Sequence, residues 1–201
     1  MGAETASGYQ FLDPTAENHR FDYLPDFDQN RDVIIFKGHE PVFGTTPLAK
    51  PEESLDFSRW QIRIRPDRSM EVEISSYWKG SQEASFRSFF IYSGPTEIKE
   101  TLEEVVNDIS QGARLLKYSH SDPLDFKKRF EVTLKYHAND YCKKVGDILI
   151  FPEPYIRERC SATGKEERRY PILYSSRSYS KDEVEFNIPK GSDVYHLPEP
   201  V

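Results

Sequence analysis

Trp60-Gln61-Ile62-Arg63-Ile64 is the stretch that decides the fold of this chain, because apolar and polar residues alternate along it. The same alternation returns in Met70-Glu71-Val72-Glu73-Ile74, and turn-forming residues lie between the two stretches at positions 66–69. A period of two places every apolar side chain on one face of a β-strand. The sequence therefore predicts an antiparallel hairpin over residues 58–78, ended by Gly80, with one buried face and one polar face.

Two helices are expected after this hairpin. The apolar residues within 82–92 fit either a short helix or a buried strand, and the helix is the preferred interpretation. Over residues 95–111 the pattern is clearer, because Pro95 suits a first helical turn and Gly112 suits the position after the last turn. We expect the aliphatic stripe of this second helix to pack against a sheet while its acidic side faces solvent. The stripe consists of Ile98, Leu102, Val105, Val106 and Ile109.

Strands are expected again from residue 115 onward. Residues 130–137 show the longest alternation in the chain, and the continuous apolar run at 148–151 predicts a buried strand. Further strands are expected near residues 170–174 and 184–188. The predicted fold class is therefore mainly β (α+β), an antiparallel β-sandwich-like domain with one or two helices.

Composition limits the function classes that fit this chain. With 201 residues, of which 37% are hydrophobic and 13% aromatic, the chain can build a substantial core. The net charge of −7 argues against a general nucleic-acid binder, and glutamates interrupt the basic run at residues 157–169. The chain contains no stretch of about 18 apolar residues, so no transmembrane segment is expected. The first residues lack the features of a secretion signal, and the localisation of the chain stays open, as does whether Met1 is a natural start.

Two cysteines are the candidate nucleophiles. Cys142 lies five residues after His137, and a Cys-His pair can act as a nucleophile and base when the imidazole reaches the sulfur. We expect His137 instead to be a surface residue on the polar face of its strand. Cys160 is the second candidate; two free thiols are slightly favoured over one bridge. The remaining histidines have no ligands at metal-site spacing, so neither a metal nor another cofactor is expected: His19, His39, His120 and His196.

Several aromatic residues offer an alternative, noncatalytic function. A flat face of exposed aromatic side chains could bind a sugar or a peptide, although core positions are the more usual place for such residues. The candidates are Trp60, Tyr77, Trp78, Tyr136 and Tyr155.

Tyr9-Gln10-Phe11-Leu12-Asp13-Pro14-Thr15 is the stretch that bears most directly on function. On its own, Asp-Pro-Thr after a short apolar run is the ordinary end of a strand that runs into a turn. In a second interpretation, the Asp13 carboxylate is the acidic member of a catalytic triad, where it orients the catalytic histidine.

The second interpretation comes from a resemblance that spans most of the chain. Residues 9–15 and the segment Phe21 to Phe36 resemble the last active-site strand and the exit segment of transglutaminase-like proteins, relatives of papain-type cysteine proteases. Further short motifs resemble the β-rich domain that follows the core in bacterial multidomain members of this family: Trp78-Lys79-Gly80, Arg87, Glu167 to Ile172, Ile188 to Gly191 and Leu197-Pro198. The resemblance implies that Asp13 is the triad acid. In that family the Cys and His precede the Asp, whereas the twelve residues before Asp13 include neither.

The resemblance implies a domain organisation and a role. Residues 1–40 would be the C-terminal remnant of a transglutaminase-like core, 41–56 a connector, and 57–201 a β-rich accessory domain that stops early. The chain would then be noncatalytic, with the core of its parent protein as partner and with an unpaired sheet edge that favours self-association. The parent would be periplasmic or part of the cell envelope. Two alternatives stay open, namely a carbohydrate- or peptide-binding module and a cysteine hydrolase that uses Cys142 or Cys160.

Overall fold

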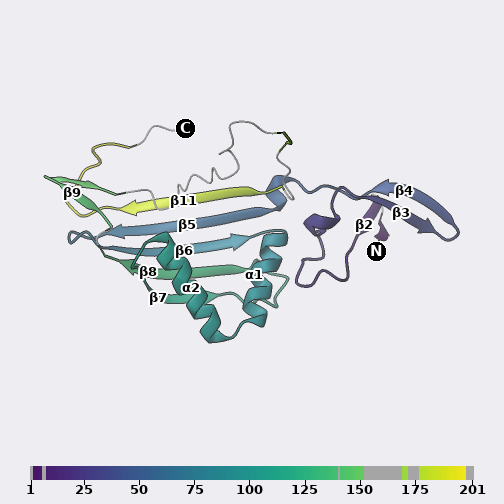
Figure 1. Ribbon diagram of the computed structural model, residues 1–201, viewed down its shortest axis with the longest axis horizontal. Helices are drawn as coiled ribbons and strands as arrows, with labels where there is room; N and C mark the ends of the chain where they lie inside the picture. Colours follow the sequence, from purple (N-terminus) through teal and green to yellow (C-terminus); the bar gives the residue numbers. More distant parts are fainter. Residues whose placement is uncertain (1, 6–7, 140, 152–168, 172–176, 198–201) are drawn as a thin grey trace.

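A five-stranded sheet forms the centre of the molecule (Figure 1). The computed structural model describes residues 2–5, 8–139, 141–151, 169–171 and 177–197. The strand order is β11-β5-β6-β8-β7, and α1 and α2 lie across one face of this sheet. The mainly β, α+β class is therefore confirmed. The elements of this layer pair are β5 (Leu55–Ile64), β6 (Met70–Trp78), α1 (Ser81–Tyr92), α2 (Pro95–Ile109), β7 (Arg114–His120), β8 (Glu131–Ala138) and β11 (Tyr179–Asn187).

The predicted hairpin is confirmed as the antiparallel pair of β5 and β6, in which Trp60 faces Ile74. The turn between them forms because the Asp67 carboxylate accepts hydrogen bonds from the amide and the hydroxyl of Ser69. The alternating sequence then places apolar and polar side chains on opposite faces of the sheet. Its apolar side chains lie beneath the helices, and its polar side chains form the opposite face of the sheet.

Both predicted helices are present and cover the apolar face. On α1, the Phe86 ring stacks on Trp78 of β6 with 3.6 Å between ring centroids. On α2, Ile98, Leu102 and Val106 are buried as expected. Val105 is not, because it lies beside the buried stripe and 41% of it is exposed. Over the described residues, no helix is long and apolar enough to cross a membrane.

Strand β11 makes the sheet mixed. It pairs in parallel with β5, from Tyr179 opposite Leu55 to Asn187 opposite Arg63, whereas the sequence led us to expect antiparallel strands. Alternation predicts which residues share a face but not the direction of the neighbouring strand. The layer that covers the sheet within the described residues is helical rather than a second sheet.

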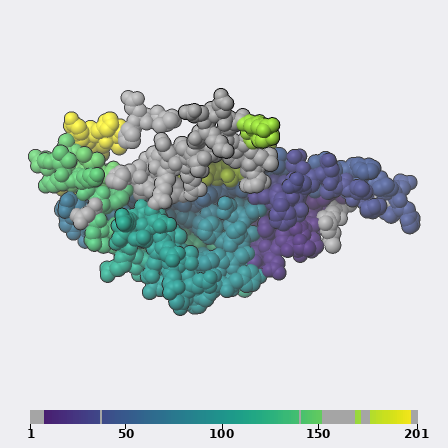
Figure 2. All heavy atoms as spheres, viewed as in Figure 1, coloured from purple at the N-terminus to yellow at the C-terminus, as the bar shows by residue number. Residues whose placement is uncertain are grey.

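Two small hairpins and two short 3₁₀ turns precede the sheet. The hairpins pair β1 (Gly2–Thr5) with β2 (Gly8–Phe11) and β3 (Asp32–Lys37) with β4 (Glu40–Thr45). Strand β4 therefore occupies the start of the expected connector at 41–56, and the β3–β4 hairpin crosses the expected boundary at residue 40. Figures 1 and 2 show this hairpin as a narrow extension at one end of the molecule. The short turns are η1 (Asp26–Asp28) and η2 (Pro51–Glu53).

The apolar run at 148–151 differs from its prediction. It forms β10 (Ile148–Ile150), which among the described strands pairs with β9 (Lys143–Val145) and stands outside the five-stranded sheet. Ile148 and Ile150 are consequently exposed, so the prediction of a buried strand is wrong. The strand expected at residues 170–174 lies mostly outside the described residues.

Candidate functional site

Asp13 lies in a tight turn just after β2. Its Oδ1 accepts hydrogen bonds from the Thr15 amide at 2.9 Å and from the Thr15 hydroxyl at 2.7 Å. The Ala16 amide closes the turn by donating to the Asp13 carbonyl at 3.3 Å. The hydrogen bonds from Thr15 stabilise the charged carboxylate and hold the pKa of Asp13 below its ordinary value. Among the described residues, no histidine bonds to this carboxylate.

A second carboxylate lies close to Asp13. Burial raises the pKa of Asp28, and the negative charge of Asp13 and a hydrogen bond with its carboxyl raise it further. The backbone carbonyl of Asp28 also accepts a hydrogen bond from the Thr46 hydroxyl at 2.6 Å, which ties η1 to the chain that follows β4. The two carboxylates therefore influence each other's protonation.

Residues 17–26, which we name the strap, run from the Asp13 turn along helix α1. Tyr92 Oη donates to Glu17 Oε2 at 2.8 Å, and Asn18 Nδ2 donates to Ser88 Oγ at 2.8 Å. At the other end of the helix, Ser81 Oγ lies 3.4 Å from His19 Nε2. It also accepts a hydrogen bond from the Asp26 amide at 3.3 Å. The helix residues 81, 88 and 92 share one face because they are spaced by seven and four positions.

The strap also makes a close contact at the start of α1. Gly80 has φ +69°, and a Cβ placed there would lie 2.7 Å from Tyr23 Cζ. Only glycine therefore allows the Tyr23 ring to approach the backbone so closely. The Tyr23 hydroxyl donates to the Asp26 carboxylate, which fixes the ring over Gly80.

A buried ion pair fastens α1 to the rest of the sheet domain. Arg87 is fully buried and donates to Glu83 Oε1 from Nε at 2.9 Å and from Nη2 at 2.7 Å. The same guanidinium donates to the carbonyls of Pro123 and Lys128, both at 2.7 Å. Arg20 of the strap reaches this pair, with its Nη1 4.0 Å from Glu83 Oε1. These contacts satisfy the buried charges and make the pair a structural anchor.

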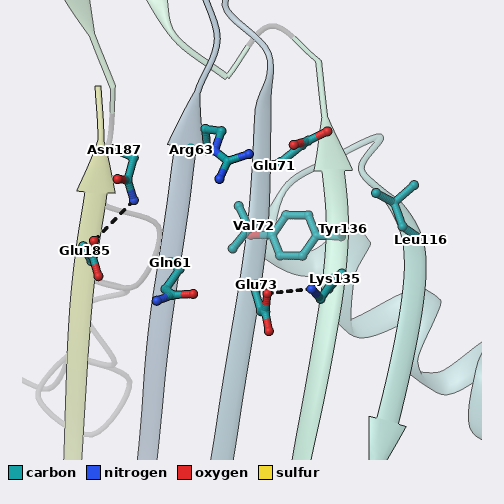
Figure 3. A pocket seen from close by; sticks show the side chains of 10 residues that line it. All are labelled: Gln61, Arg63, Glu71, Val72, Glu73, Leu116, Lys135, Tyr136, Glu185 and Asn187. Atoms are coloured by element: carbon teal, nitrogen blue, oxygen red, sulfur yellow. Dashed lines mark hydrogen bonds and ion pairs between the residues drawn. The ribbon is translucent and has the colours of Figure 1, made fainter. Parts of the chain in front are cut away.

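The polar face of the sheet carries rows of side chains that cross four strands. One row reads Glu185, Gln61, Glu73 and Lys135, and in it Lys135 Nζ lies 2.8 Å from Glu73 Oε2 (Figure 3). This row lines a hollow of about 510 Å³ on the open face. Lys135 and Glu73 pair with each other inside the hollow, and Gln61 and Asn187 add neutral hydrogen-bonding groups to its lining.

The aromatic candidates do not gather on this face. Trp60, Trp78 and Tyr136 are buried in the core on the opposite face of the sheet. Tyr77 does lie on the polar face, where its ring centroid is 4.7 Å from that of Phe57. The Arg129 guanidinium also lies 3.9 Å from the Tyr77 ring centroid, so the ring is flanked by protein groups. Tyr155 lies outside the described residues.

The Cys-His candidates are not brought together. Cys142 is a free thiol that is 2% exposed, and burial raises its pKa. His137 lies on the polar face, where its Nε2 is 2.9 Å from Asn139 Oδ1. Cys160 lies outside the described residues. Within the part of the chain that the structure describes, no group of three or more His, Cys, Asp or Glu side chains could hold a metal ion.

The strap contacts could hardly be predicted from the sequence. Ser81, Ser88 and Tyr92 interrupt the apolar pattern of α1, and their helical spacing was the available signal. Their partners Glu17 and Asn18 lie in a segment without periodicity, so no pattern could pair them with the helix. A scan against protein-family models, a search of curated proteins and a search of solved structures found no match to this chain.

Proposed function

We propose that this chain is a noncatalytic accessory module of a transglutaminase-like cysteine protease or acyltransferase. In this proposal the catalytic Cys and His belong to a core outside the chain, and Asp13 supplies the acid of the triad. The chain alone then hydrolyses no amide and transfers no acyl group, because a triad acid cannot act without a nucleophile and a base.

The docking of the strap on α1 supports this proposal most directly. It joins the segment that resembles a core strand to the domain that resembles an accessory module, through hydrogen bonds to Ser81, Ser88 and Tyr92. The protonation state of Asp13 also fits the role of a triad acid. Its pKa is held low by Thr15, so the carboxylate is charged at neutral pH and able to accept a hydrogen bond from an imidazole.

The reading frame upstream of the Ala3 codon in the source DNA provides the test. We expect it to encode a Cys and then a His, and we expect the longer protein to incorporate a fluorescent amine into casein or to cleave a peptide amide. Replacing Asp13 with Ala in that protein should lower kcat on the order of 10⁴-fold, because loss of the acid leaves the histidine in the wrong tautomer.

The matched control for this test is Asp22→Ala, which removes an exposed carboxylate of the strap that pairs with Arg20 at 3.4 Å. It should leave kcat within about twofold of the wild-type value, because exposed ion pairs contribute little. An upstream frame without Cys and His, or an Asp13→Ala enzyme as active as the wild type, would refute the proposal.

The second candidate function is binding of a carbohydrate or peptide on the polar face. The hollow lined by Gln61 and Glu73 favours it, since exposed polar side chains there can hydrogen-bond a neutral ligand. Trp60 and Trp78 face the other side of the sheet, so tryptophan fluorescence would respond poorly. Backbone chemical shifts of β5 and β6 should instead be followed while neutral oligosaccharides and unstructured peptides are added. A flat response across both panels would exclude this function.

A further inference from the structure

Helix α1 carries a continuous polar stripe that faces the strap. The stripe consists of Ser81, Ser85, Ser88 and Tyr92, whose spacings of four, three and four place them on consecutive turns of one helix face. Three of these residues contact the strap, at both ends of the helix. The Ser85 hydroxyl donates to the Ser81 carbonyl at 3.0 Å and makes no hydrogen bond to the described residues of the strap. The contacts are therefore specific to individual residues of the stripe.

The chain between Asp13 and these contacts is short and contains two fixed turns. The Ala16 amide bonds back to the Asp13 carbonyl, and Glu17 follows immediately with its bond to Tyr92. Asn18 has φ +62°, a left-handed conformation that asparagine adopts more readily than most non-glycine residues. The bond from Asn18 to Ser88 restrains the chain at this turn.

Helix α1 is itself held firmly on the sheet domain. The buried pair of Arg87 and Glu83 ties it to the loop at 123–128, and the Phe86 ring stacks on Trp78 of β6. A segment that is bonded to α1 is therefore held in place relative to the sheet. Glu17, Asn18 and His19 follow the Asp13 turn and connect it to α1 in this way.

We propose that Ser88 and Tyr92 form a clasp that fixes the position of the Asp13 carboxylate relative to the sheet. They are positioning residues, since they act on Asp13 through the strap and touch no reacting group. The catalytic consequence rests on the proposed function, because only there is Asp13 a triad acid. The mechanical consequence concerns this chain alone, and it can be measured without any partner.

Hydrogen exchange of the Thr15 and Ala16 amides tests the clasp, since both amides donate hydrogen bonds within the Asp13 turn. In the double variant Ser88→Ala/Tyr92→Phe these amides should exchange about tenfold faster, because two hydrogen bonds that fix the strap next to the turn are lost. The matched control is Ser85→Ala, which removes a hydroxyl of the same stripe but leaves the strap contacts intact. Amides of β6 serve as the internal reference for an intact sheet.

The titration of Asp13 by NMR gives a second readout. Loosening the turn weakens the hydrogen bonds from Thr15, so the pKa of Asp13 should rise towards its ordinary value in the double variant and stay unchanged in Ser85→Ala. Unchanged exchange and titration in the double variant, or equal changes in both variants, would overturn the clasp.

The longer protein distinguishes failure of the clasp from failure of the proposed function. There the double variant should lower kcat while KM stays unchanged, because the substrate is still bound but the acid is misplaced. If exchange confirms the clasp but Asp13→Ala leaves kcat unchanged, the proposed function fails and the clasp stands. If Asp13→Ala abolishes activity but the double variant changes neither exchange nor kcat, the clasp fails and the proposed function stands.

Discussion

Arg87 is the side chain on which the position of α1 depends. Replacing it with Met should lower the free energy of unfolding by about 3–5 kcal/mol, because the buried Glu83 then keeps only the longer contact with Arg20 at 4.0 Å. Urea denaturation followed by circular dichroism measures this loss. Adding Glu83→Gln to Arg87→Met should restore part of the stability, since the stranded charge is removed. Equal urea midpoints for Arg87→Met and wild type would show that the pair does not anchor the helix.

The neighbouring carboxylates of Asp13 and Asp28 predict a pH-dependent stability. The pKa of Asp28 is raised in the folded state, so its contribution to stability is present at acid pH and is lost as the pH rises through the raised value. Asparagine does not ionise, so Asp28→Asn removes this loss of stability at higher pH. The melting temperature of Asp28→Asn should therefore exceed that of the wild type by more at about pH 7 than at about pH 3. A difference that is the same at both pH values would contradict this account.

Among the elements, the start of α1 makes the sharpest prediction. Gly80→Ala places a Cβ against Tyr23 in addition to straining a left-handed backbone. Gly112→Ala is the matched control, because Gly112 has φ +76° but no atom within 4 Å of its added Cβ. Gly80→Ala should be the more destabilising of the two by about 1–3 kcal/mol. Thermal unfolding of both variants measures the difference.

A Tyr23→Ala background checks the cause of that difference. Without the ring, the extra cost of Gly80→Ala should disappear and leave only the backbone strain that Gly112→Ala also carries. Persistence of the extra cost would mean that the contact between the strap and Gly80 is not its origin.

The elements also show how far the sequence could predict this fold. The β5–β6 hairpin, α2 and β8 were predictable because each carries a period that burial imposes on it. The pattern of α1 also fitted a buried strand, although the helix was the preferred interpretation. The exposed position of β10 was not, since an apolar run of the same length suits a central strand or a small hairpin outside the sheet. The apolar β3–β4 hairpin likewise gives no sign in sequence that Phe36 and Phe43 are more than 70% exposed.

The candidate site was predictable only in part. Asp13 stood out because an aspartate followed by Pro-Thr has recognisable turn chemistry, and the turn is present. The strap contacts could not be predicted, because they join residues about 70 positions apart that share no period. Such pairs are determined by how α1 sits on the sheet, which is a property of the assembled fold.

For the whole molecule, Cys142 is a natural reporter of global unfolding. Its thiol is buried in the core and its pKa is raised by burial, so a variant with Cys160→Ser should react slowly with Ellman's reagent in the folded state. The labelling rate should rise with urea in parallel with unfolding. Fast labelling of the folded protein, with an apparent thiol pKa well below about 8.5, would instead favour the cysteine hydrolase alternative.

The parallel pairing of β5 with β11 has a mechanical consequence. A force that pulls on the chain before Leu55 and after Asn187 acts on these two strands in opposite directions along their length. It therefore loads their hydrogen bonds in shear, and the bonds of the whole strand pair must fail together. The antiparallel β5–β6 hairpin, pulled at its open end, would unzip one bond at a time. Along this axis the strand pair behaves as a tie, which resists tension between the chain before Leu55 and the chain after Asn187.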